Sequence, residues 1–247
     1  MKDVLELFED RTVVHVTSDE VETAASLGEL VKDKSYVPEV LKWLPLAAKE
    51  YHISANLKDY VVVPVTMFPS DLPNRNSVAF PYEELMRFDV QASMPAYKTW
   101  RGKPTFSEHD HGDHRKAKGI IFDVYMKPMK NVVGDIYKVI ALAGFDRTKD
   151  PELANAIARG DRKRYSMGAS ISGVECSVCG AQSTARNHRN TECGHVTRGR
   201  IVLHETARGV KPAYYLGRGI QGFELSSVAV PAWVAAEEGE TIFNLGV

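Results

Sequence analysis

Cysteine is scarce in this chain. Only three cysteines occur among 247 residues, and all of them lie between positions 176 and 193. An odd number of cysteines in one local cluster excludes a disulfide framework, which would need paired cysteines. The sequence therefore predicts a reduced, cytosolic environment and a metal-binding use for the thiols.

Long hydrophobic runs and an excess of one charge are also absent. No apolar stretch approaches the roughly 18–20 residues that a membrane helix needs, and the first residues, MKDV, lack the features of a signal peptide. Lysine plus arginine (31) nearly balance aspartate plus glutamate (32). Bulk charge therefore gives no reason to expect a membrane or nucleic-acid partner.

Strand-like segments outnumber helical ones and are separated by glycine and proline turns, which favours a mostly antiparallel β or α+β domain. We expect strands at 59–68, 118–126, 138–142, 200–206, 213–216 and 222–230, and one that carries Ser166. Amphipathic helices are expected at 21–31 and 37–51, and a short helix at 82–87.

One further helix has clear ends. Asp150 suits the N-cap, Pro151 suits the first helical position, and Gly160 suits the end of the helix. This helix leads directly into the strand of Ser166. The segment 96–114 is expected to be a loop that ends in a histidine-rich tip.

The tip, HDHGDH at 109–114, allows three interpretations. It is a solvated polar loop, or it holds a metal, or it supplies a general base to a serine nucleophile. The H-x-H-x-D-H spacing resembles the zinc motif of metallo-β-lactamases and implies a metallohydrolase. The residues of that site would be His109, His111, Asp113 and His114. Residues 103–108, however, make a poor candidate for the buried strand that such a motif follows.

Three short blocks of the chain form a further pattern. The first is KP at 103–104 with EHD at 108–110 and AKGIIFD at 117–123. The second is YSMG at 165–168, after a helix, and the third is FELSSV at 223–228 with PA at 231–232. Together they span about residues 59–236, and in this order they resemble tailed-phage prohead (capsid maturation) proteases, which are related to herpesvirus assemblin.

The resemblance implies an α+β fold built on a mostly antiparallel β-barrel of assemblin type with flanking helices. It implies a serine endopeptidase that cleaves scaffold and capsid proteins, and often itself, inside the procapsid in the host cytoplasm. It also implies a homo-oligomer or an association with the procapsid.

Carried over residue by residue, the resemblance assigns Ser166 as the nucleophile, His109 as the base and Glu224 as the carboxylate that orients the base. On its own, a serine in a Ser-Met-Gly run such as Ser166 is most often a small strand residue, with Ser170 and Ser172 on the same face. Glu224 on its own is equally a surface strand residue that forms a cross-strand pair. The alternatives that stay open are His111 for the base, and Asp123 and His204 for the third member.

The cysteines form a separate pattern. Cys176-x2-Cys179 is followed after 13 residues by Cys193-Gly194-His195. Three thiolates and an imidazole predict a closed, structural Zn²⁺ site of Cys176, Cys179, Cys193 and His195. His188 is the alternative fourth ligand, because one residue between Cys193 and His195 is a tight spacing.

The predicted organisation is a helical N-terminal arm (1–57), a protease domain (58–236) with a zinc-knuckle insertion at about 174–200, and a tail (237–247). Removal of the arm as a propeptide is left open. The rival interpretation is a non-catalytic zinc protein of capsid assembly or nucleic-acid binding, which the arginines of the insertion favour: Arg186, Arg189, Arg198 and Arg200. Aromatic residues that could stack on bases do not accompany them, which weakens this interpretation.

Overall fold

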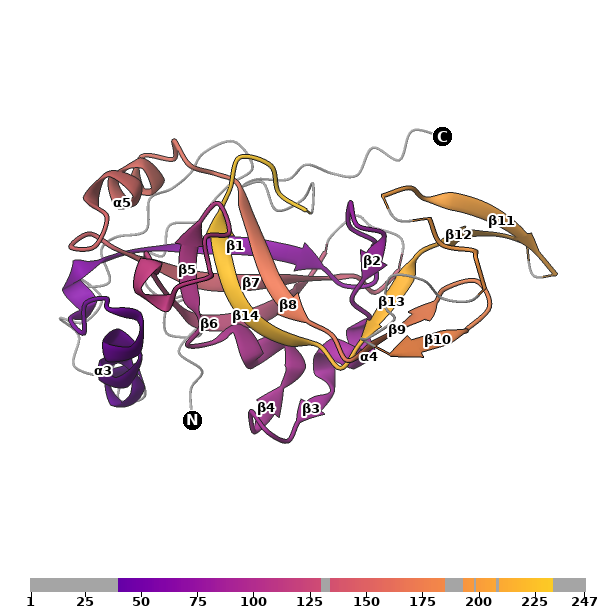
Figure 1. Ribbon diagram of the computed structural model, residues 1–247, viewed down its shortest axis with the longest axis horizontal. Helices are drawn as coiled ribbons and strands as arrows, with labels where there is room; N and C mark the ends of the chain where they lie inside the picture. The colour runs from indigo at the N-terminus through magenta and orange to yellow at the C-terminus, as the bar shows by residue number, and fades with distance from the viewer. Residues whose placement is uncertain (1–39, 130–133, 185–192, 198, 208, 233–247) are drawn as a thin grey trace.

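The computed structural model describes residues 40–129, 134–184, 193–197, 199–207 and 209–232. Strands predominate over helices in these ranges (Figure 1), which confirms the α+β class. The expected helix at 21–31 and the tail at 237–247 lie outside the described residues. None of the helices in these ranges is long and apolar enough to cross a membrane.

A six-stranded sheet forms the body of the protein. Its order is β1-β7-β6-β5-β14-β8, and only the β5–β14 pair is parallel. The strands are β1 (Tyr60–Pro69), β5 (Pro104–Ser107), β6 (Gly119–Pro128), β7 (Tyr137–Asp146), β8 (Tyr165–Ser170) and β14 (Gln221–Ser227). The sheet curls into a half-barrel (Figure 1), so that its two edge strands, β1 and β8, contact each other.

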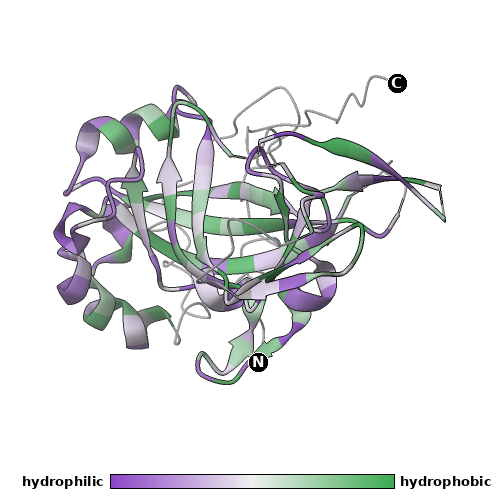
Figure 2. Ribbon diagram, turned by 45° about the vertical axis from the view of Figure 1, so that its right-hand side comes forward, coloured by the Kyte–Doolittle hydropathy of each residue, from purple (hydrophilic) through white to green (hydrophobic). Residues whose placement is uncertain are grey.

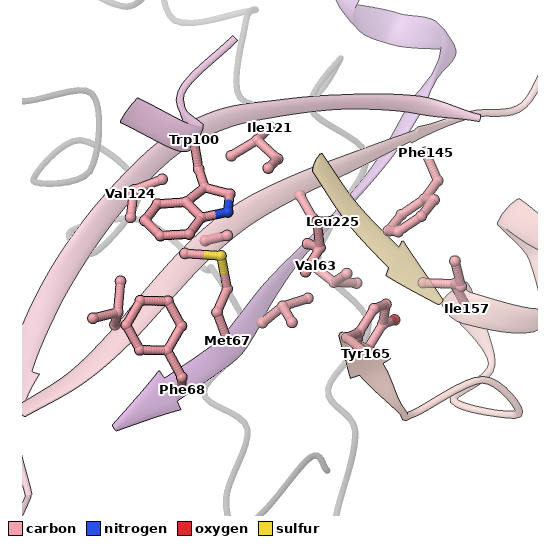
Figure 3. Close-up of a cluster of buried hydrophobic side chains, with 14 of the residues drawn as sticks. Val63, Met67, Phe68, Trp100, Ile121, Val124, Phe145, Ile157, Tyr165 and Leu225 are labelled. Atoms are coloured by element: carbon pink, nitrogen blue, oxygen red, sulfur yellow. The ribbon is translucent and has the colours of Figure 1, made fainter. Parts of the chain in front are cut away.

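The main hydrophobic core fills the inside of this curl (Figure 3). Val63 and Met67 reach it from β1, Tyr165 from β8, Leu225 from β14 and Ile157 from a helix. Each buried side chain of this size contributes about 1.5–3 kcal/mol relative to an exposed one. The burial of side chains from strands that are distant in sequence therefore stabilises the curled sheet.

A second core lies on the outer face of the sheet, under helix α3 (Val40–Tyr51). Leu44 of the helix packs with Tyr60 and Phe122, whose rings meet edge to face at 5.2 Å. Figure 2 shows the apolar residues concentrated on the strands, with mixed polarity on the helices that cover them. The described part of the expected arm therefore contacts the sheet directly.

The remaining elements are short. A four-stranded sheet has the order β10-β9-β13-β2, and two hairpins, β3–β4 and β11–β12, stand apart from it. The strands are β2 (Val78–Ala79), β3 (Phe88–Asp89), β4 (Met94–Pro95), β9 (Gly173–Cys176), β10 (Gln182–Thr184), β11 (Val202–Thr206), β12 (Gly209–Ala213) and β13 (Tyr215–Arg218). The helices are α4 (Tyr82–Met86), α5 (Pro151–Ala158) and the 3-10 turns η1 (Leu57–Asp59), η2 (Ala96–Trp100) and η3 (His114–Lys116).

Helix α5 has the ends predicted for it. The Asp150 side chain accepts a hydrogen bond from the N–H of Leu153 at 3.0 Å, and Gly160 takes φ +74° just beyond the helix. The expectation of a loop over 96–114 is wrong, because this segment contains η2 and the buried strand β5. Pro104 is tolerated there as the first residue of the strand.

Candidate active site

The predicted serine and glutamate lie on neighbouring strands. Strand β14 lies beside β8 (Figure 1) and pairs with it antiparallel, with Ser226 opposite Ser166 and Glu224 opposite Gly168. The register shifts between Gly222 and Glu224, so Phe223 is the extra residue of a β-bulge. Glu224 is therefore a diagonal neighbour of Ser166, two residues along β14 from the residue directly opposite the serine.

Alternation places the polar residues of these strands on one face. Tyr165 and Leu225 belong to the main core, and Met167 packs against it. Because successive side chains of a strand point to opposite faces, Ser166, Glu224 and Ser226 lie on the outer face. All three are buried there, and Ser166 is only 3 % exposed.

The loop after β5 brings His109 over this face. Glu108 and His109 take φ +52° and +58°, a left-handed conformation that costs about 1–3 kcal/mol per residue without glycine. Hydrogen bonds hold the turn in place: the N–H of Glu108 donates to the Ser227 carbonyl at 2.9 Å, and the N–H of Asp110 donates to the Ser107 carbonyl at 3.1 Å. The Glu108 carboxylate in turn accepts from Arg162 and from the N–H of Ala229.

His109 meets Glu224 in a direct polar contact. The distance from Nδ1 of His109 to Oε1 of Glu224 is 3.0 Å. The carboxylate is 1 % exposed and the imidazole is 40 % exposed, so one partner is fixed in the protein and the other reaches the surface. The second carboxylate oxygen, Oε2, accepts from the hydroxyl of Ser226 at 2.5 Å.

This arrangement changes the proton affinity of the imidazole. The hydrogen bond to Glu224 raises the pKa of His109 above its ordinary value of 6.5, and partial burial of the ring opposes that rise. The negative charges of Glu224 and Glu108 add to the increase. The carboxylate therefore stabilises the imidazolium form, as the third member of a catalytic triad does.

Ser166 is near this pair but not bonded to it. Within the described residues no hydrogen bond joins Ser166 to His109; the connection runs through Ser226, which is opposite Ser166 and bonds Glu224. Directly opposed side chains on one face of an antiparallel pair have Cβ atoms about 4.5–5.5 Å apart. Ser226 is a residue that the sequence interpretation missed, and the alternation of FELSS along the strand was its one signal.

The other predicted members of the tip separate into two groups. The ligand atoms of His111 lie with those of His109 and Glu224, all within 4.8 Å of one another. Asp113 instead bonds Arg115 at 2.8 Å, and His114 lies 3.5 Å from Glu50. The four-residue set that resembles a metallo-β-lactamase site is therefore not assembled around one point.

The two alternatives for the third position lie elsewhere. Asp123 is buried in β6, where its Oδ1 accepts from the N–H of Val124 at 2.8 Å. His204 is on β11, and its Nε2 lies 2.9 Å from the carbonyl of His195. Glu224 is thus the carboxylate of the predicted set that contacts His109.

Gly168 leaves space for the carboxylate. A Cβ at this position would lie 2.5 Å from the Phe223 ring and 2.6 Å from Oε1 of Glu224. We expect Gly168→Ala to lower the free energy of unfolding by about 1–3 kcal/mol through this overpacking. Gly112→Ala in the tip is the matched control, because nothing lies within 4 Å of its added methyl group. Urea denaturation of both variants measures the effect, and an equal change in the two would contradict the account.

The cysteine cluster forms a second centre at the end of β9. The ligand atoms of Cys176, Cys179, Cys193 and His195 lie within 4.8 Å of one another, and Sγ of Cys176 is 3.8 Å from Nδ1 of His195. The four predicted ligands are therefore brought together at metal-binding distance. The alternative ligand, His188, lies outside the described residues.

Local structure explains how the first two cysteines are positioned. The N–H of Gly180 donates to the Cys176 carbonyl at 2.9 Å, and Gly180 takes φ +74°, which closes a tight turn. Burial raises the pKa of the Cys176 thiol, while the N–H groups of Cys179 and Val178 oppose the rise. The hydroxyl of Ser177 donates to the Pro212 carbonyl and ties the turn to β12.

Comparisons of this chain with protein-family models, with curated proteins and with solved structures find no match.

Proposed function

We propose that this chain is a serine endopeptidase of the prohead-protease type, with Ser166 as the nucleophile, His109 as the general base and Glu224 as the orienting carboxylate. One observation carries the proposal: a buried glutamate, held by Ser226, contacts a surface histidine on the same sheet face as Ser166. The proposed base, nucleophile and acid come from three distant segments, which are the β5–β6 loop, β8 and β14.

The chemistry follows the general pattern of such sites. His109 takes the proton of the Ser166 hydroxyl, and the oxygen attacks the peptide carbonyl carbon to form an ester as the C–N bond breaks. The imidazolium returns its proton to the leaving amine, and water then hydrolyses the ester. Glu224 stabilises the imidazolium through the contact at Nδ1. His109 has to approach Ser166 when a peptide binds, because hydrogen bonds of ligand-free catalytic sites are often long and tighten only in the complex.

The curled, mostly antiparallel sheet supports an assemblin-type barrel as the fold of this protease. By the resemblance of the three sequence blocks, the proposed substrates are scaffold and capsid proteins, and the chain itself, inside the procapsid. The proposal includes a homo-oligomer or procapsid-associated state. The rival non-catalytic zinc protein requires only the cysteine cluster and gives Ser166 no role.

Cleavage that depends on Ser166 tests the proposal. The purified chain is incubated with a library of proteome-derived peptides, and products of the peptides and of the chain itself are followed by mass spectrometry. We expect cuts with the wild type, none with Ser166→Ala, and undiminished cutting with Ser170→Ala, an exposed serine of the same strand. Identical cuts by wild type and Ser166→Ala, or no cuts by the wild type, would contradict the proposal.

The raised pKa of His109 predicts a pH dependence. A general base acts in its neutral form, so activity should rise with pH through the His109 pKa, above 6.5. Titration of the imidazole by NMR in Ser166→Ala should give a value above 6.5 that falls in the double variant with Glu224→Gln. A histidine that titrates at or below 6.5 in both proteins would contradict the role of Glu224.

We propose further that the cysteine cluster holds a structural Zn²⁺. Tetrahedral bonds of about 2.0–2.3 Å place zinc ligands about 3.3–3.8 Å apart, and the Cys176–His195 separation of 3.8 Å fits this range. Three thiolates and an imidazole leave no open position on the ion. When bound, zinc would supply folding energy to the turn and the β11–β12 region, and it takes no part in the peptidase steps.

A further inference from the structure

The candidate base belongs to a second group of metal-ligand donors. The ligand atoms of His109, His111 and Glu224 lie within 4.8 Å of one another. Two imidazoles and one carboxylate are the protein ligands of open zinc sites, where the remaining position holds water or another small molecule. The cysteine cluster, in contrast, offers four protein ligands.

The three donors are held in place before any ion binds. The N–H of His111 donates to the His109 carbonyl at 2.8 Å, a tight turn that brings both imidazoles to the same side. The His111 ring lies 5.5 Å from that of Phe223. The Ser226 hydroxyl fixes the Glu224 carboxylate, as outer hydrogen bonds do for ligands at known metal sites.

The other acids of the loop are already paired with cations. Lys116 bonds Asp110 and Arg115 bonds Asp113, both at 2.8 Å. The donors that remain grouped are therefore one buried carboxylate and two exposed imidazoles. Such a site is accessible to an ion from solvent.

We propose that His109, His111 and Glu224 form a reversible Zn²⁺ site whose occupation inhibits the peptidase. The inhibitory role rests on the proposed function, whereas ion binding does not. A bound ion either occupies the nitrogen lone pair of His109 or displaces His109 from its contact with Glu224. Proton transfer from Ser166 to His109 requires both the free lone pair and that contact. The chain thus has two zinc sites of different kinds, one closed and structural, the other open and regulatory.

Zinc binding is measured first, without reference to activity. Ser166→Ala is prepared with the cysteine site filled and titrated with Zn²⁺ by calorimetry, with the stoichiometry checked by native mass spectrometry. We expect a second equivalent to bind, and His111→Asn to weaken it by at least about tenfold, as loss of groups at metal sites does. His114→Asn is the matched control, because His114 lies beside Glu50 and outside the group. Absence of the second equivalent, or equal weakening by both variants, would overturn the inference and leave the proposed peptidase unaffected.

The inhibitory role is tested by the ratio of cleavage rates with and without zinc, taken within each protein. We expect added Zn²⁺ to lower the rate of the wild type and of His114→Asn, and to leave the ratio near one for His111→Asn. Bound zinc without inhibition would overturn the regulatory role alone. Zinc-stimulated cleavage that persists in Ser166→Ala would overturn the proposed function itself and identify a metallohydrolase.

Discussion

Glu224→Gln should lower the rate of peptide cleavage by about 10²–10⁴-fold, the usual contribution of acid–base catalysis. The change is nearly isosteric, so the Ser226 hydroxyl still has an oxygen to bond and the strand register is preserved. The amide carries no charge, however, and no longer stabilises the imidazolium of His109. The buried position of Glu224, 1 % exposed, keeps water from replacing the lost interaction.

Kinetics with a peptide that the wild type cleaves measure this effect, with circular dichroism to verify the fold. Glu205→Gln, on the exposed surface of β11, is the matched control and should keep the wild-type rate. A Glu224→Gln protein that is folded and retains the full rate would contradict the role assigned to the glutamate.

Cys176→Ser should release the proposed structural zinc and unfold the region around it. Cys176 is the buried member of the cluster, and a serine hydroxyl is a poor zinc ligand compared with a thiolate. Structural zinc in small peptides contributes about 10–16 kcal/mol of binding energy, which is coupled to folding. The main core contains no residue of the cluster, so the half-barrel should stay folded.

Metal analysis and limited proteolysis test this prediction together. We expect the variant to lose its tightly bound zinc and to be cut between residues 173 and 213, while the wild type becomes equally sensitive only with a chelator. Val178→Ala, in the same turn but without a ligand atom, is the control and should retain zinc. A Cys176→Ser protein with a full equivalent of zinc and unchanged proteolysis would show that the cluster is not a zinc site.

Locally encoded features could be predicted from the sequence. Helix α5 is marked by Asp150, Pro151 and Gly160 within one segment, and each residue acts through its own backbone chemistry. Strands β1 and β6 are recognisable because β1 consists mostly of β-branched and aromatic residues and β6 contains a run of them from Ile120 to Tyr125, interrupted only by Asp123. No information from the rest of the chain is needed for these assignments.

Features that depend on distant contacts could not be predicted in this way. Strand β5 has only four residues between Lys103 and Glu108, and its burial comes from its neighbours β6 and β14. The contact of His109 with Glu224 joins residues 115 positions apart. The position of Ser226 opposite Ser166 depends on the β14–β8 register, which the sequence alone does not give. The resemblance of short sequence blocks singled out Glu224. The physical reason that Glu224 contacts His109 is the folding of the sheet, which places β14 beside β5.

Labelling with a serine-directed fluorophosphonate probe is the most direct test of the central claim, because it needs no known substrate. The probe forms a bond only with a hydroxyl activated by a neighbouring base, so peptide mapping should locate a single adduct on Ser166. Labelling should fall sharply in His109→Ala and persist in Ser170→Ala. No adduct on Ser166 in the folded wild type, or an adduct whose rate is unchanged in His109→Ala, would contradict a serine peptidase centred on these residues.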